Sequence, residues 1–404
     1  MISRPVFTNI PSKIYELILL SMVVIIYTCV CAEADMYVPA FPQMIKYFNI
    51  AENEIQLVLS INFLGLCLAS IFSGPLSDSF GRRKVILGGL FLLMISSIIL
   101  VGLDDFKVLL FWRFIQGIAA AVPMVCAGAM FMDQYSGEKA SKLIGFINAV
   151  ITAAMAAAPV IGAYISEEFG WRANFIVVML LSIISFFGFL LLIEESLKLN
   201  LKRKLNLISI TKDYAKVLSS LTFICYMMLA CLPFIVIIVY ITNLSVIFVN
   251  HLGINLVDYS YYQASTMGTF VIFSLLSVKI INAKGMNFTK NFGVILSVIG
   301  SCALLIVSLV DHTSAILICI SMAVVAAGGS MMSGTFGVKA LSLFPEINGT
   351  AMAACTALRL LLIAVFVLIS EFYFDGTIIP ISFIIVGYTL FTAGFYVLLS
   401  LKEK

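Results

Sequence analysis

Four charged residues stand inside stretches that are otherwise apolar: Glu33, Asp35, Arg113 and Arg359. A charged side chain within a bilayer is costly unless it is paired, hydrated or neutralised, so such residues mark functional sites by default. A carboxyl group in that setting can take up and release a proton, and an arginine can hold a carboxylate or an anionic ligand. The sequence therefore indicates chemistry based on buried charge.

The composition shows what must position these charges. The chain has 404 residues, of which 62% are hydrophobic and 11% are charged, far from the usual composition of a soluble domain. A helix of about 20 apolar residues can cross a bilayer. The sequence predicts an all-α membrane protein with twelve spans, at 15–37, 55–75, 85–103, 107–132, 143–166, 174–193, 218–242, 260–281, 290–310, 314–338, 348–370 and 379–401.

The basic residues predict the orientation of these spans. Among the segments outside the spans, those on one side hold all the Lys and Arg except Lys46, Lys107 and Arg172. This bias places both termini in the cytoplasm. The longest polar segment, 196–217, predicts a cytoplasmic linker between a six-helix bundle at 1–195 and a second at 218–404. The net charge of +3 gives no indication of a nucleic-acid partner.

Two residue types argue against a metal site or an enzyme. All nine cysteines lie in predicted spans without the spacing of metal ligands, so we interpret them as packing residues. The two histidines, His251 and His312, belong to no H-E-x-x-H motif and to no nucleophile arrangement. We therefore expect no metal, no cofactor and no enzymatic activity.

The first span carries two acids only two residues apart. Residues at that spacing point to roughly opposite sides of a helix, so Glu33 and Asp35 should have different environments. Arg113 lies about 12 Å deep in the fourth span, and it needs a carboxylate that span one can offer. Tyr37 is expected to line a substrate cavity, together with the polar residues of spans two and four, Asn62 and Gln116.

The segment 74–84 joins two spans with one acid and three cations. Gly74 is expected to lie where a helix end approaches another backbone, and Gly81 to supply a positive φ in a tight connection. Asp78 can accept hydrogen bonds, and the two arginines that follow Gly81, Arg82 and Arg83, can hold carboxylates or carbonyls. On charge alone, this segment is a cytoplasmic loop that fixes topology.

Span five has a face of small residues. Ala154, Ala158 and Gly162 recur every four residues, which allows close helix packing, and Pro159 can bend the helix. In the second half of the chain, residues 279–290 occupy the place equivalent to 74–84. Gly285 is retained there and the acid is missing, as expected of a duplicated and diverged architecture.

Four of these stretches resemble a known family. Gly-Pro-Leu-Ser-Asp-x-Phe-Gly-Arg-Arg at 74–83 is similar to the cytoplasmic gate of major facilitator superfamily transporters, and Arg-x-x-Gln-Gly at 113–117 to their fourth helix. Asp-Met-Tyr-x-Pro-Ala-x-Pro at 35–42 resembles the first helix of their drug:proton antiporters, especially the Bcr/CflA group. Span five resembles the antiporter motif, with alanine at three glycine positions, Ala154, Ala158 and Ala163.

This resemblance implies two six-helix bundles and alternating access. It implies a proton-coupled exporter of small amphipathic molecules, as in multidrug efflux, with a dedicated exporter of a metabolite or siderophore as the alternative. Asp35 and Arg113 are then linked to proton coupling, while Glu33 lies outside the family pattern and leaves the proton carrier open. We expect a monomer within the lipid bilayer of a bacterial inner membrane, with protons and a small molecule as its partners.

Arg359 departs from the family, in which a neutral residue is usual at this place in the eleventh span. It either pairs with an acid of span one, or faces the cavity and binds an anionic group of the substrate. The remaining interpretation is a structural arginine bound to carbonyls. The energetic cost of facing lipid favours the cavity.

The gate interpretation can be tested at Asp78. If Asp78 and Arg82 hold the cytoplasmic side closed, Asp78→Ala should insert at normal levels but lose most of its transport, because cycling between the two open states is impaired. Transport is measured alongside the amount of protein in the membrane. Normal transport by a well-expressed Asp78→Ala variant would contradict the gate interpretation.

Overall fold

The computed structural model describes residues 12–134, 137–197, 207–344 and 348–402. Within these ranges the regular secondary structure is entirely helical, with no β-strand. The contacts divide the chain into two compact units. Unit 1 contains residues 1–37 and 61–210, and unit 2 contains residues 38–60 and 211–404. The predicted all-α class is confirmed.

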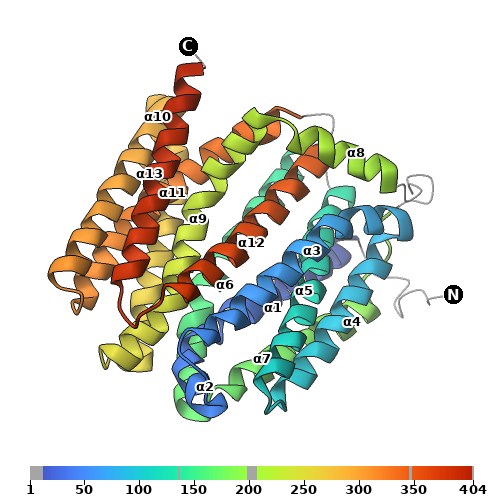
Figure 1. Cartoon of the computed structure of the whole chain (residues 1–404). Coiled ribbons are helices and arrows are strands. Elements are labelled where there is room, and N and C mark those ends of the chain that lie inside the picture. The colour runs from blue at the N-terminus through green and yellow to red at the C-terminus, as the bar shows by residue number, and fades with distance from the viewer. Residues whose placement is uncertain (1–11, 135–136, 198–206, 345–347, 403–404) are drawn as a thin grey trace. The chain divides into compact units, whose positions relative to one another are not determined.

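Unit 1 is built mainly from six long helices, coloured blue to green in Figure 1. They are α1 (Ser12–Asp35), α3 (Leu57–Phe80), α4 (Arg82–Val101), α5 (Phe106–Gln134), α6 (Gly137–Phe169) and α7 (Arg172–Leu192). Apolar residues fill these helices on nearly all sides, as expected when a helix packs on neighbours with one face and on lipid with the other.

Unit 2 contains the remaining long helices, coloured yellow-green to red in Figure 1. They are α9 (Leu221–Val246), α10 (Leu256–Val310), α11 (Ala315–Ser342), α12 (Asn348–Phe372) and α13 (Ile379–Lys402). Its short elements are η1 (Val38–Ala40), α2 (Phe41–Phe48), η2 (Glu54–Gln56), α8 (Leu207–Leu218), whose first turn still belongs to unit 1, and the π-helical turn η4 (Ile247–His251).

Helix α10 supplies two spans. It has 55 residues, which would extend about 80 Å as a straight helix, far more than the bilayer core of about 30 Å. Gly285 interrupts it with φ 82° and ψ 165°. Each of the twelve predicted spans therefore coincides with helix in the described residues, and ten described segments are long and apolar enough to cross a membrane.

Gly285 has a counterpart in unit 1. Gly81 separates α3 from α4 with φ 106° and ψ 141°, so the same left-handed break occurs at equivalent places in the two halves. A side chain with a Cβ rarely adopts this conformation. The predicted equivalence of 279–290 and 74–84 is therefore visible in the backbone.

The connection at 74–84 is shorter than predicted. Helix α3 continues through Pro75 to Phe80 and α4 begins at Arg82, so Gly81 alone joins them. A Cβ on Gly74 would meet no atom within 4 Å among the described residues, and the expected approach to another backbone stays a prediction. Polar residues continue the helix because its backbone hydrogen bonds do not depend on apolar side chains.

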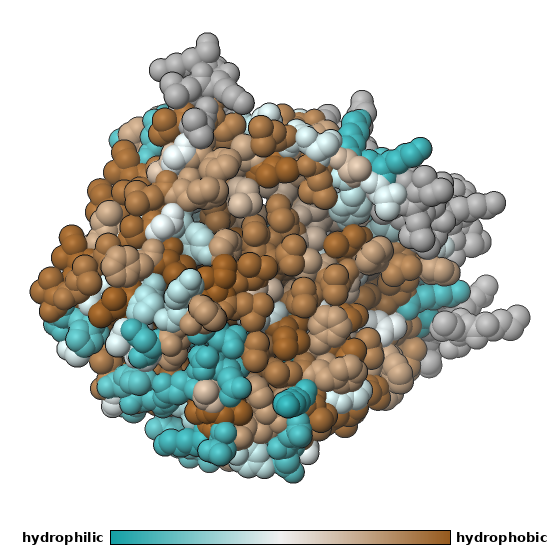
Figure 2. All heavy atoms as spheres, in the orientation of Figure 1, coloured by the Kyte–Doolittle hydropathy of each residue, from teal (hydrophilic) through white to brown (hydrophobic). Residues whose placement is uncertain are grey.

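The surface fits a lipid environment. Large apolar side chains such as Phe72, Leu180 and Ile295 are about half exposed. Figure 2 shows hydrophobic residues over most of the visible face, with hydrophilic residues gathered near its lower edge and upper right. An exposed apolar surface of this extent is stable only when lipid covers it. The protein is a multi-pass membrane protein.

A ring of polar side chains lies in the core of unit 2. Gln56 Nε2 donates to Asn243 Oδ1 (2.5 Å), Asn243 Nδ2 donates to Ser370 Oγ (3.1 Å), and Ser370 Oγ donates to Gln56 Oε1 (3.0 Å). All three residues have an exposure of 0%. The ring joins η2 to α9 and α12. Segment 38–60 is therefore fixed within unit 2, although α1 before it and most of α3 after it belong to unit 1.

The ring predicts a specific stability effect. Asn243→Leu removes the acceptor of the buried Gln56 Nε2 and one donor to Ser370 Oγ, which keeps its bond to Gln56 Oε1. The loss of the Nε2 acceptor should lower the free energy of unfolding by about 1 to 3 kcal/mol. Thermal unfolding in detergent measures the change. Ser245→Ala is the matched control, because Ser245 lies on the same helix with an exposure of 0% and its Oγ has no partner in the described structure. Equal effects of the two substitutions would contradict the role of the ring.

Candidate functional site

Glu33 and Arg113 form an ion pair in the core of unit 1. Arg113 Nη1 lies 2.7 Å from Glu33 Oε1, and the exposures of the two residues are 0% and 1%. The same nitrogen donates to the backbone carbonyl of Glu33 at 3.3 Å. The structure thus brings α5 to the acid of α1 that lies outside the family pattern.

Polar groups surround the guanidinium of Arg113 on its other sides. Nη1 also donates to Gln116 Oε1 at 2.5 Å, and Nη2 donates to Tyr37 Oη at 2.7 Å. The Tyr37 ring lies against the guanidinium, with 4.4 Å between its centroid and Arg113 Cζ, a distance typical of a cation–π contact. Gln116 is held in turn by Ser97, whose Oγ accepts from Nε2 at 2.9 Å.

Asn62 connects α3 to this pair. Its Nδ2 donates to Glu33 Oε1 at 2.7 Å and to the backbone carbonyl of Arg113 at 3.0 Å. Two glycines allow α3 and α5 to come this close. A Cβ on Gly65 would stand 2.3 Å from the carbonyl oxygen of Phe114, and a Cβ on Gly117 would stand 2.1 Å from that of Asn62. Any larger residue would push the helices apart and move Asn62 away from the ion pair.

Helix α6 packs on the end of α1 through its small residues. A Cβ on Gly162 would stand 1.8 Å from the carbonyl oxygen of Met36. Ala158 lies in a buried cluster with Ala32 and Met36, and Pro159 lies within the helix. Ala154, one turn earlier, is half-buried. The small-residue face of α6 therefore sets the position of the end of α1, which carries Glu33 and Asp35.

Asp35 has a different environment from Glu33. It is buried, with an exposure of 8%, and within the described part of unit 1 no hydrogen bond or ion pair reaches its carboxylate. The oxygens that accept hydrogen bonds from Arg113 Nη1 belong to Glu33 and Gln116, and none belongs to Asp35. Among the two acids that the sequence offers, Glu33 is the partner of Arg113.

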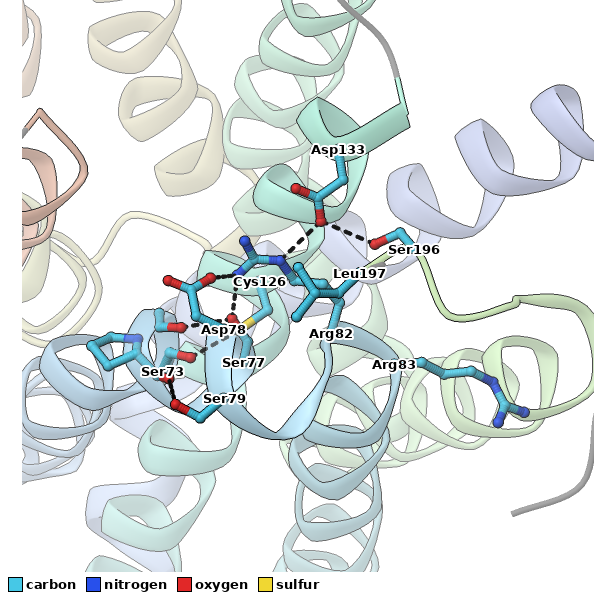
Figure 3. A network of polar contacts seen from close by, with 12 residues as sticks. Ser73, Ser77, Asp78, Ser79, Arg82, Arg83, Cys126, Asp133, Ser196 and Leu197 are labelled. Atoms are coloured by element: carbon cyan, nitrogen blue, oxygen red, sulfur yellow. Dashed lines mark hydrogen bonds and ion pairs between the residues drawn. The ribbon is translucent and has the colours of Figure 1, made fainter. Parts of the chain in front are cut away.

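The residues of the predicted gate form a second polar cluster in unit 1. Figure 3 shows the guanidinium of Arg82 between Asp78 and Asp133. Its Nη1 lies 2.6 Å from Asp78 Oδ1 and donates to Ser77 Oγ at 2.5 Å, and its Nε lies 3.0 Å from Asp133 Oδ2. Ser196 also donates to Asp133, at 3.1 Å. Arg82 thus ties the end of α3 to the end of α5.

Arg83 points away from this cluster, as Figure 3 shows. Its Nε donates to the carbonyl of Ile193 at 2.6 Å, and its Nη2 donates to that of Leu190 at 2.7 Å. It therefore binds the otherwise open carbonyls at the end of α7. Glu195 accepts from the backbone N–H of Arg83 at 3.3 Å. Its Oε2 would lie 2.4 Å from a Cβ on Gly81, but this carboxylate is the exposed end of a flexible side chain, so it is the positive φ that requires glycine here.

Arg359 belongs to unit 2, where it is half-buried on α12. Its Cζ lies 5.5 Å from the centroid of the Phe234 ring. The buried Nε atom has no hydrogen bond, and no ion pair involves this residue within the described part of unit 2. No carbonyl accepts a hydrogen bond from Arg359 Nε in the described part of unit 2.

The sequence missed several partners in these clusters. Asp133 and Glu195 lie just after predicted spans, on the side of the membrane where Lys and Arg are enriched. Their positions could have indicated carboxylates that bind the cations of 82–84. Ser97 and Asn174 gave no signal, because a single Ser or Asn in a span is common. Among the described residues, no group of three or more His, Cys, Asp or Glu side chains could hold a metal ion.

A family model described as Major Facilitator Superfamily matches residues 23–367. The chain belongs to the Major Facilitator Superfamily. The structure aligns with that of the xylose transporter XylE from E. coli with a TM-score of 0.70 and 14% sequence identity, over 94% of this chain and 97% of that one. This likeness concerns the fold alone, and it confirms the predicted major facilitator fold.

Two relatives within the superfamily are associated with drug resistance. The chain is 25% identical over 325 residues to a bicyclomycin resistance protein homolog of Haemophilus influenzae, covering 80% of this chain and 81% of that protein. It is 25% identical over 243 residues to the multidrug resistance protein MdtL of Salmonella paratyphi C, covering 60% of this chain and 61% of that protein. The predicted likeness to Bcr-type transporters is confirmed.

The geometry predicts unequal roles for the two acids of α1. Replacing Arg113 with Met leaves Glu33 buried without its counter-charge, which should lower the free energy of unfolding by about 3 to 5 kcal/mol. The double variant Arg113→Met, Glu33→Gln should recover part of this loss, whereas Arg113→Met, Asp35→Asn should not. Unfolding in detergent measures all three. Equal recovery by the two double variants would contradict the pairing.

Proposed function

We propose that this superfamily member is a proton-coupled antiporter that exports small amphipathic molecules, as in multidrug efflux, by alternating access. The buried Glu33 and Arg113 pair is the observation that supports the proposal most directly. The relatives named for bicyclomycin and multidrug resistance support the direction of transport and the class of substrate.

The physical logic of coupling follows from burial. An ionised pair in the core is stable only while both charges remain. A proton that neutralises Glu33 removes the counter-charge of the Arg113 cation, whose hydrogen bonds then go to neutral groups, so the preferred packing of α1 against α5 should change. A proton that favours one packing and a substrate that favours the other are thermodynamically coupled. Asp35, buried and without a partner in unit 1, is the second site in this proposal at which a proton can bind.

Substrate-binding side chains are proposed in each unit. Tyr37, Gln116 and Asn62 hold Arg113 and Glu33, and so couple any ligand that touches them to the ion pair. Arg359 is proposed to face the cavity, because its half-buried guanidinium has an unsatisfied Nε and rests near Phe234. A cation above an aromatic ring suits the anionic or zwitterionic end of an amphipathic molecule.

The gate and the setting complete the proposal. Asp78, Arg82 and Arg83 are proposed to form the cytoplasmic gate, where the arginines bind the ends of α5 and α7. We further propose an N-terminal bundle at 1–195, a linker at 196–217 and a C-terminal bundle at 218–404. The distribution of Lys and Arg supports cytoplasmic termini in a bacterial inner membrane. The protein is proposed to act as a monomer.

Everted membrane vesicles test the coupling. With the lumen acidified, vesicles that contain the protein should accumulate a fluorescent amphipathic cation, because protons leave the lumen as the compound enters. The same vesicles should lose the accumulated compound when an ionophore collapses the pH gradient. The fluorescence of the amphipathic cation measures both its accumulation and its loss. Vesicles without the protein are the control.

The opposite gradient separates the remaining possibilities. A symporter should accumulate the compound only when the lumen is alkaline, because substrate and proton then move inward together. Accumulation that ignores the pH gradient in both directions would contradict proton coupling. Glu33→Gln should abolish the gradient-driven component, whereas Asp105→Asn, an exposed acid outside the helices, should retain it.

A further inference from the structure

A narrow crevice lies beside the Glu33 and Arg113 pair in unit 1. It is lined by side chains from α1, from the turn after α1, from α5 and from α7, including Glu33, Tyr37, Arg113, Gln116 and Asn174. Phe175 and Val178 close its apolar side. Helix α7 therefore contributes one polar residue, Asn174, to the surroundings of the ion pair. The proposed coupling by Glu33 and Arg113 assigns Asn174 no role.

Two oxygen atoms in this lining have no donor. Glu33 Oε1 accepts from both Arg113 and Asn62, whereas Glu33 Oε2 is buried without a hydrogen bond. Asn174, with an exposure of 0%, donates from Nδ2 to Ser166 Oγ at 2.6 Å, and its Oδ1 is buried without a hydrogen bond. Buried polar atoms almost always have a partner, so two such atoms in one crevice point to a missing donor.

The other polar groups in the lining are already engaged. Gln116 accepts from Arg113 and donates to Ser97, and Tyr37 Oη accepts from Arg113. Neither can satisfy both oxygens. An ionised carboxylate offers acceptors only, but a proton on Oε2 turns that atom into a donor. Protonation of Glu33 on Oε2 therefore makes that atom a donor, while Asn174 Oδ1 in the same crevice remains an acceptor.

We propose that Asn174 is a positioning residue for the transported proton, whose Oδ1 accepts the hydrogen bond from Glu33 when that carboxyl group is protonated on Oε2. This rests on the proposed function and adds to it. The two oxygens of Glu33 then have separate tasks, because Oε1 keeps Arg113 and Asn62 while Oε2 carries the proton. Proton uptake does not require Arg113 to leave.

The other charged and titratable groups around Glu33 are few among the described residues. Arg113 faces it from α5, and its own segment contributes Cys29, Cys31, Asp35 and Tyr37. Helices α3 and α7 contribute Asn62 and Asn174, which carry no charge. A change at Asn174 therefore alters the hydrogen bonding of Glu33 without altering the charge around it.

Trp171 offers a reporter for this test. It packs edge-on against Phe175, with centroids 5.7 Å apart, and Phe175 lies 5.5 Å from the ring of Tyr37. The sequence has two tryptophans, so Trp112→Phe leaves Trp171 as the single fluorophore. The full-length purified protein in detergent can then be titrated with acid and base, and its fluorescence followed without any substrate.

The expected results distinguish Asn174 from a structural residue. Glu33→Gln should abolish the fluorescence titration. Asn174→Leu should move its midpoint to lower pH by about half a unit or more, because the protonated form loses its acceptor. Asn174→Thr, which keeps an acceptor oxygen, should restore the midpoint toward that of the parent. Ser182→Ala is the matched control, a residue of 0% exposure on the same helix that bonds only to the carbonyl of Met179.

Two outcomes would overturn the proposal. One is an unchanged titration midpoint in Asn174→Leu while Glu33→Gln still abolishes the titration. That result would reject the role of Asn174 but leave the proposed antiport function intact. The other is a titration that persists in Glu33→Gln. If Leu prevents folding, Asn174→Ala removes the amide without adding volume and gives the same test. Failure of antiport itself is read separately, from the everted vesicles of the parent protein.

Discussion

The buried Glu33 and Arg113 pair is the constraint on which unit 1 depends. Two charges removed from water are tolerated only with close geometry and further hydrogen bonds. The surrounding helices meet that demand in specific ways. Gly65 and Gly117 allow α3 and α5 to touch, so that Asn62 reaches Glu33. Tyr37 and Gln116 accept further hydrogen bonds from Arg113. A change in any of these contacts changes the cost of keeping the pair buried.

The two units manage buried polarity differently. In unit 2, Gln56, Asn243 and Ser370 satisfy one another in a closed ring of neutral groups. Such a ring stabilises one packing and has little reason to change with pH. In unit 1 the buried polar cluster contains an ion pair, and Glu33 Oε2 and Asn174 Oδ1 lack donors. Acceptors that lack a donor next to a titratable group gain one when that group is protonated. This arrangement suits a site with two protonation states.

The gate cluster shows how a short motif acts through its surroundings. Gly81 provides the break between α3 and α4, with a φ of 106° that side chains rarely adopt. Arg82 and Arg83 then face in different directions, one toward the carboxylates of Asp78 and Asp133 and the other toward the carbonyls at the end of α7. Adjacent arginines thus tie α3 and α4 to two other helices of the same unit.

The sequence by itself determined the class, the spans and the residues worth examining. Apolar length is a local property, so each predicted span coincides with helix, and Gly81 and Gly285 were identifiable as breaks because only glycine suits that φ. The sequence also selected Glu33, Asp35 and Arg113, since an embedded charge is conspicuous whatever surrounds it. Only the tertiary structure decided that Arg113 binds Glu33 and not Asp35, because that choice depends on the rotation of α1 against α5. Asn174 and Asp133 became visible only there, since a residue's partner on another helix is set by packing across the bundle, which no local pattern records.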